Sequence, residues 1–281
     1  MTTTAATAAT QQTARRWREP LGRAGITARG VLYLLLGILA IQFARGETSS
    51  DQVSQVGAFE TLAEQPFGKF LLVAMIAGLI ALCLWRLIQA FVGDPVEGDE
   101  AKDRVEYLGK AVIYGALVVT AIKVASEVWS GTSGSASSTT QQSGDAQNQQ
   151  VAWSLFELPG GRLLVGILGV ALIVIAVYQA YEHTVEAKFM ERLAPPGTTA
   201  KGIEAIGRIG YAARSVVFAA SGVFFIVSAV QYDPNQSKGI SGTLAEFAQN
   251  SAGQIVLWGV AIGFALFGIF CFAEAVYRRS A

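Results

Sequence analysis

Six long apolar stretches, separated by polar segments, dominate the hydropathy pattern of the chain. They cover residues 24–44, 70–92, 108–128, 163–183, 211–230 and 255–276. A helix needs roughly 20 mainly apolar residues to cross the hydrocarbon core of a bilayer. Each stretch therefore predicts one transmembrane helix. The fourth is the clearest, because no charged residue lies between Leu163 and Tyr181, and the third is the weakest, because Lys123 interrupts it.

Lysine and arginine are distributed unevenly around these spans. If both termini lie on one side of the membrane, sixteen of the 21 Lys and Arg residues fall on that side. Basic residues accumulate in the cytoplasmic segments of membrane proteins. We therefore expect both termini, and the loops 93–107 and 184–204, to face the cytoplasm.

Composition agrees with a membrane protein and excludes several other classes. The chain is 52% hydrophobic and 15% charged, whereas soluble domains carry about 25% charged residues. The formal net charge of zero excludes a nucleic-acid binder that works through a basic surface. Two cysteines and one histidine exclude a disulfide scaffold and a zinc finger.

The chain also contains an internal repeat. Residues 22–91 align with residues 207–276 without a gap, and the identical positions include six glycines and two arginines. A middle copy fits less well, because Ala116 stands where the other two copies have Arg29 and Arg214. We divide the chain into a disordered, basic tail (1–20) and three two-span repeats at 21–93, 104–186 and 202–278. The middle repeat carries a long, flexible external loop at 130–150.

These repeats predict an all-α integral membrane fold, in which six transmembrane helices form three parallel-repeat helical hairpins. Each hairpin enters and leaves on the same side, so the axis that relates them runs along the membrane normal. A pseudo-threefold ring is the simplest closed arrangement, and a linear row of hairpins is the alternative. The apolar connectors at 57–68 and 242–253 predict short interfacial helices on the external side.

Small residues recur on one face of the predicted helices. Such residues allow membrane helices to approach one another closely, so we interpret them as helix-packing positions. The set comprises Gly22, Gly25, Gly37, Gly78, Gly207, Gly210, Gly222, Gly259 and Gly263.

Charged and polar residues share these packing faces near the cytoplasmic boundary. Arg29 and Arg214 lie on the glycine stripes of two first helices, and the three second helices end in Gln89, Glu182 and Glu274 at equivalent positions. An unpaired charge at this depth is costly, so we expect an intramembrane charge belt formed by these five residues. In particular, Arg214 is expected to pair with Glu274, or with Glu182 or Gln89 of a neighbouring hairpin.

The sequence contains no recognisable catalytic motif. It has no nucleophile elbow, phosphate-binding glycine loop, HExxH or paired-cysteine motif. Glu182, His183 and Glu186 cluster at the end of the fourth span, but they are too few for a typical metal site. We expect no catalytic, metal or cofactor site and no enzymatic activity.

Three segments of the chain resemble the signature of a bacterial membrane family. They are GRAGITARGVLY (22–33), GRIGYAARSVVF (207–218) and AFETLAEQPFGKFLL (58–72). This family is catalogued as domain of unknown function 1206 and is common in actinobacteria. The resemblance covers residues 21–278 and implies a six-span protein of the inner membrane, with no assigned activity.

We expect a structural, sensor or accessory component of the cell envelope. The alternative is a small-solute transporter or channel with a path between the three hairpins. The lipid bilayer is the expected partner, no nucleic acid is expected, and a second copy or other membrane proteins remain open.

Overall fold

The computed structural model describes residues 2–93, 100–130 and 144–279, and every long element in it is a helix. Six helices are long and apolar enough to cross a membrane, as expected. The protein is therefore a multi-pass membrane protein. These spans lie in α1 (Thr2–Ala44), α3 (Gly68–Val92), α4 (Ala101–Ser130), α6 (Gly161–Gln179) with the π-helical turn η2 (Ala180–Val185), α7 (Gly197–Gln231) and α9 (Ser251–Tyr277).

Short helices connect the two spans of each repeat, as predicted for the first and last repeats. They are η1 (Ser50–Gln52) with α2 (Gln55–Glu64), α5 (Gly144–Phe156), and η4 (Pro234–Gln236) with α8 (Ile240–Phe247); η3 (Lys188–Arg192) lies between repeats. We call the side on which α2, α5 and α8 lie the connector end. The opposite side, where α3, η2 and α9 finish, is called the basic end.

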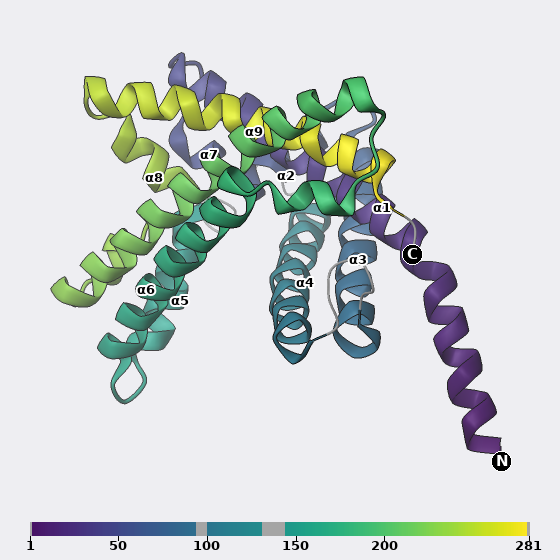
Figure 1. The fold of residues 1–281 in the computed structure, drawn as a ribbon. Helices are drawn as coiled ribbons and strands as arrows, with labels where there is room; N and C mark the ends of the chain where they lie inside the picture. The colour runs from purple at the N-terminus through teal and green to yellow at the C-terminus, as the bar shows by residue number, and fades with distance from the viewer. Residues whose placement is uncertain (1, 94–99, 131–143, 280–281) are drawn as a thin grey trace.

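Two segments differ from the expected organisation. The segment 1–20 is predicted to be disordered, but α1 begins at Thr2 and projects from the rest of the molecule in Figure 1. Alanine, glutamine and arginine favour helix, and the following span continues the same helix. The predicted loop 130–150 ends earlier than expected, because α5 begins at Gly144. The remainder of that loop, 131–143, lies outside the described residues.

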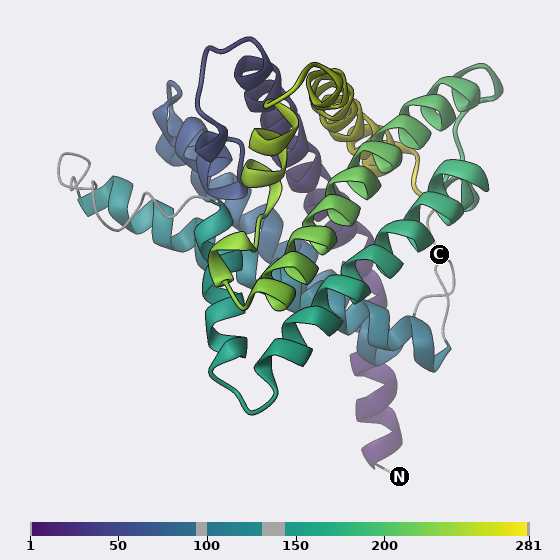
Figure 2. The ribbon, with the colours of Figure 1, turned by 90° about the vertical axis from the view of Figure 1, so that its left-hand side faces the viewer.

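The six spans pack in a cyclic order. Within repeats, α1 packs on α3, and α7 packs on α9. Between repeats, α4 packs on α3, α7 packs on α6, and α1 packs on α9. Each of these three interfaces joins the second helix of one repeat to the first helix of the next, as a pseudo-threefold ring requires. Figures 1 and 2 show the three inter-repeat pairs fanning out in different directions.

Equivalent glycines make equivalent helix–helix contacts in the first and last repeats. A Cβ atom on Gly25 would lie 2.5 Å from Leu82 Cβ, and one on Gly210 would lie 2.7 Å from Phe267 Cβ. Leu82 and Phe267 occupy equivalent positions in the first and last repeats. The first helix of each of these hairpins can therefore lie directly against the second only because it carries glycine at this point.

The middle repeat is open instead. Its helices α4 and α6 are well separated in Figure 1 and make no substantial contact. The position of Gly25 is taken by Val112, whose side chain would hold the two helices apart. Val112 is 67% exposed and Ile175, at the equivalent of Leu82, is 47% exposed. The ring is therefore closed at every junction except the one between α4 and α6.

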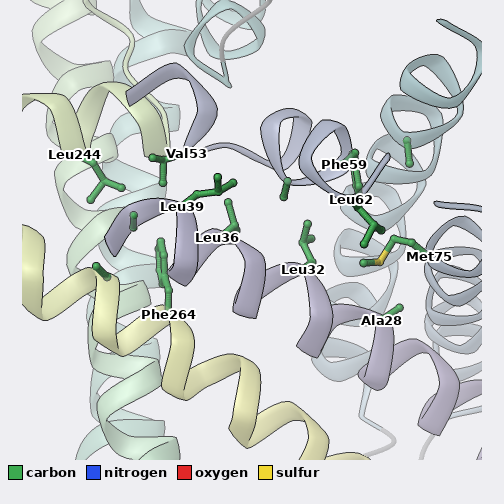
Figure 3. Close-up of a cluster of buried hydrophobic side chains, with 14 of the residues drawn as sticks. Ala28, Leu32, Leu36, Leu39, Val53, Phe59, Leu62, Met75, Leu244 and Phe264 are labelled. Carbon is green, nitrogen blue, oxygen red and sulfur yellow. The ribbon is translucent and has the colours of Figure 1, made fainter. Parts of the chain in front are cut away.

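The centre of the molecule towards the connector end is filled by apolar side chains. In Figure 3, Leu36 and Leu39 of α1 lie on the side of Val53 and Phe264, and Leu32 faces Phe59 and Leu62 of α2 and Met75 of α3. The same cluster includes Ala121 and Val124 of α4. Burial of this apolar surface holds the connector end together.

Candidate functional site

The five predicted residues of the charge belt lie on five elements at the basic end. Arg29 is on α1, Gln89 on α3, Glu182 on η2, Arg214 on α7 and Glu274 on α9. Arg29, Gln89 and Glu274 are buried, whereas Glu182 and Arg214 are partly exposed. Among these five residues, the structure contains one ion pair.

That contact is the ion pair between Arg29 and Glu274. Arg29 Nη2 lies 2.5 Å from Glu274 Oε2, and both side chains are less than one-tenth exposed. The other carboxylate oxygen, Oε1, lies 3.6 Å from Nη1 of Arg278. Glu274 was expected to pair with Arg214, and this prediction is wrong. The reason is the cyclic packing, which places α9 against α1 of the next repeat as well as against α7 of its own.

Gln89 belongs to a different contact. Its side-chain oxygen accepts a hydrogen bond of 2.7 Å from Nη1 of Arg86, three residues earlier on α3. Arg86 is buried, and its guanidinium lies 4.2 Å from the centre of the Trp85 ring. Arg278 approaches the same ring to 4.5 Å. Arg86 was not predicted as a member of the belt, although its position near the end of a span is visible in the sequence.

Arg214 is surrounded by aromatic rings. Its Cζ atom lies 4.8 Å from the ring centre of Phe267, 5.2 Å from that of Tyr33 and 5.4 Å from that of Phe218. A guanidinium interacts favourably with the faces of such rings. Among the described residues, however, Arg214 forms no ion pair, so its expected pairing with Glu274, Glu182 or Gln89 does not occur.

Glu182 is held away from Arg214 by its own neighbours. Its Oε1 atom accepts hydrogen bonds from the Tyr178 hydroxyl at 2.6 Å and from Lys188 Nζ at 2.9 Å. Hydrogen bonds to Glu182 and Glu186 raise the pKa of Lys188. A hydrogen bond from Tyr181 and one from Lys188 lower the pKa of Glu186. Glu182 lies in the π-helical turn η2, whereas its equivalent Glu274 lies in a regular α-helix.

His183 faces the inside of the same turn. Its ring lies 4.2 Å from that of Tyr211 and 6.4 Å from that of Phe189. The Nδ1 atom is buried without a hydrogen-bond partner among the described residues. In the described part of the chain, no group of three metal-ligating side chains converges at His183 or elsewhere.

The sequence analysis missed an acid–base pair that lies near the start of the first span in the second and third repeats. Glu204 pairs with Arg208 at 2.8 Å, and Glu106 pairs with Lys110. The first repeat has Glu19 and Arg23 at the same spacing, so the motif E-x-x-G-(R/K) occurs once per repeat. Arg208 also donates hydrogen bonds to the carbonyl oxygens of Thr184 and Val185 at 2.7 and 2.9 Å. This arginine therefore caps the end of the preceding repeat's second helix.

Eight of the nine predicted packing glycines lie against a neighbouring helix or connector. Gly259 is the exception: it is exposed, and a Cβ atom there would meet nothing within 4 Å. Its partner in the GxxxG pair, Gly263, lies against Ala213. Gly259 was assigned to packing from spacing alone, and the correction follows from helix geometry, since α9 turns this residue away from α7. The packed positions are Gly22, Gly25, Gly37, Gly78, Gly207, Gly210, Gly222 and Gly263.

Comparison with known proteins agrees with the threefold internal repeat. An uncharacterised protein of Bacillus subtilis (strain 168), YxxB, is 30% identical over 274 residues, which cover 96% of this chain and 94% of that protein. No solved structure matches the chain significantly. The model of one protein family matches three times, at residues 24–93, 105–182 and 209–278, once in each repeat. The chain therefore belongs to the family described as Domain of Unknown Function (DUF1206).

Proposed function

We propose that this protein is a non-transporting structural, sensor or accessory component of the bacterial cell envelope. It lies in the inner membrane with its basic end, and both termini, in the cytoplasm, and it catalyses no reaction. The excess of Lys and Arg at the basic end supports this orientation. Lipid surrounds the exposed apolar faces of α4 and α6, where a second membrane protein or a second copy could also bind.

One observation carries the non-transporting role. The middle of the molecule towards the connector end is packed with aliphatic and aromatic side chains from α1, α3, α4, α7 and α9. A solute path would have to pass through this cluster, and polar solutes need polar groups or water along their way. The charged residues of the belt lie only at the basic end, so they do not extend such a path.

The alternative is a small-solute transporter or channel with a path between the three hairpins. The separation of α4 from α6 supports this alternative, because it opens the ring at one junction. Transport would require the apolar cluster of Figure 3 to separate during each cycle.

Flux measurements distinguish the two functions. The purified full chain is reconstituted into vesicles loaded with small fluorescent anions, cations and neutral solutes, and release is compared with empty vesicles. We expect equal release. Release that requires the protein, and that falls in an Arg214→Gln variant, would establish the transporter instead.

For the envelope role, deletion of the gene should increase sensitivity to osmotic or cell-wall stress, and the intact gene should restore resistance.

A further inference from the structure

The two equivalent arginines, Arg29 and Arg214, differ in what balances their charge. Arg29 on α1 receives the carboxylate of Glu274 from the second helix of the preceding repeat in the cyclic order. If the equivalent interface between the second and third repeats were the same, Arg214 on α7 would form an ion pair with Glu182 at the end of the fourth span. The third equivalent interface has Ala116 opposite Gln89, so there both charges are replaced by neutral side chains.

The protein does not supply this carboxylate to Arg214. Glu182 points instead to Tyr178 and Lys188, 2.6 and 2.9 Å away. The Nε atom of Arg214 is buried and has no hydrogen-bond partner among the described residues. A guanidinium inside a membrane protein is costly unless an anion or hydrogen-bond acceptors compensate it.

The surroundings of Arg214 suit an oxyanion. Rings of Tyr33, Phe218 and Phe267 hold the guanidinium in place. Tyr33 of α1 and Tyr114 of α4 both pack against the apolar cluster that contains Phe267, so Tyr114 lies in the same part of the molecule. The carboxylate of Glu274, seven residues after Phe267 on α9, is already shared by Arg29 and Arg278.

Arg214 is not fully enclosed by the protein. Arg214 and Tyr114 are both partly exposed, and α4 and α6, which would close the ring beside them, make no substantial contact.

We propose that Arg214 binds a phosphate group at the basic end, in the place that Glu182 would take by analogy with the Arg29–Glu274 pair. Guanidinium groups bind phosphate through paired, charge-assisted hydrogen bonds. The phosphate is either inorganic phosphate or the headgroup of an anionic lipid. This site goes beyond the proposed envelope role and does not depend on it.

Thermal unfolding of the full chain in detergent tests the site. One arm adds inorganic phosphate, with sodium chloride of equal ionic strength as reference. The other adds phosphatidylglycerol, with phosphatidylcholine as reference. We expect a saturable rise in Tm of about 2 °C or more in at least one arm. A rise with phosphate identifies a soluble ligand, and a rise with phosphatidylglycerol alone identifies a lipid. No rise in either arm overturns the proposal.

Variants locate the effect. Arg214→Gln should abolish the rise, whereas Arg45→Gln, which removes an exposed arginine at the connector end, should leave it unchanged. If Arg214→Gln does not fold, Arg214→Lys retains the charge but loses the paired hydrogen bonds, so its affinity for the stabilising anion should fall several-fold. A rise that persists in Arg214→Gln, or an unchanged affinity in Arg214→Lys, overturns the assignment to Arg214.

Discussion

Arg29 and Arg214 occupy the same position in two repeats, yet one forms a buried ion pair and the other is held by aromatic rings. The difference arises on their partners' helices. Glu274 lies on a regular α-helix and reaches Arg29, whereas Glu182 lies on the π-helical turn η2 and binds Lys188. Equivalent interfaces therefore bring different charges together at the basic end.

The Arg29–Glu274 pair should be coupled energetically. Removing one partner of a buried pair leaves an uncompensated charge, which costs about 3–5 kcal/mol. We expect Arg29→Ala and Glu274→Ala each to lower thermal stability in detergent strongly, and the double variant to recover part of the loss. The exposed pair Arg45–Glu47 is the control, and its variants should change stability by less than about 1 kcal/mol. Strictly additive losses for Arg29 and Glu274 would contradict the coupling.

Glu60, on connector helix α2, should make stability depend on pH. Burial, followed by the nearby Glu127 and Glu64 carboxylates, raises the pKa of Glu60 above its ordinary value. The folded state therefore binds the proton more tightly than the unfolded state, and stability falls as pH rises through this pKa. Glu60→Gln, which mimics the protonated form, should raise Tm at pH 8, and the gain should disappear below the ordinary glutamate pKa.

The exposed Glu47 provides the comparison for that experiment. Glu47→Gln should give no gain in Tm at pH 8, because its carboxylate is exposed and lies 2.8 Å from Arg45. If Glu60→Gln gives the same small change at pH 5 and pH 8, the acidic contacts of Glu60 do not affect folding.

At the scale of the helices, glycine spacing predicted the packing faces well and the exceptions poorly. The stripes through Gly25 and Gly210 are recognisable because they recur in phase in two repeats. The opening of the middle hairpin was missed, although Val112 at the glycine position already indicates it. Gly259 was misassigned because small residues are common in membrane helices and their spacing does not specify which face is covered.

A matched pair of glycines on α9 tests this interpretation. A side chain at Gly263 would meet Ala213 of α7, whereas one at Gly259 would meet nothing within 4 Å. We expect Gly263→Val to destabilise the protein by roughly 1–3 kcal/mol through overpacking. Gly259→Val, one helical turn away, should have little effect. Thermal unfolding of both variants in detergent measures the difference, and equal losses would show that α7 and α9 do not pack here.

For the whole molecule, the orientation in the membrane can be tested by cysteine labelling. Cys83 and Cys271 are first replaced by alanine, and single cysteines are then introduced. Glu100→Cys and Gly197→Cys, at the basic end, should resist membrane-impermeant reagents in intact cells, whereas Gln65→Cys, at the connector end, should react. The reverse pattern would invert the topology.

The number of spans and the three repeats could be predicted from the sequence because both depend on periodic patterns along the chain. The choice of ion-pair partners could not, because it depends on which repeat lies beside which. The π-helical turn at Ala180–Val185 was equally invisible, since its sequence, AYEHTV, carries no proline or glycine that would mark an irregular helix. The repeats predicted a pseudo-threefold ring, but they did not specify that the second helix of each hairpin packs on the first helix of the next.

That cyclic order has a consequence for how such a fold can be assembled. Every interface between repeats joins a second helix to the first helix of the following hairpin, and the last hairpin returns to the first through α9 and α1. Three separate hairpins with this pair of complementary surfaces would associate as a closed trimer without any covalent link. The protein is equivalent to such a trimer fused into one chain. Because the three hairpins are parts of one chain, they need not be identical, and the middle hairpin has Ala116 in place of an arginine and no close contact between its two helices.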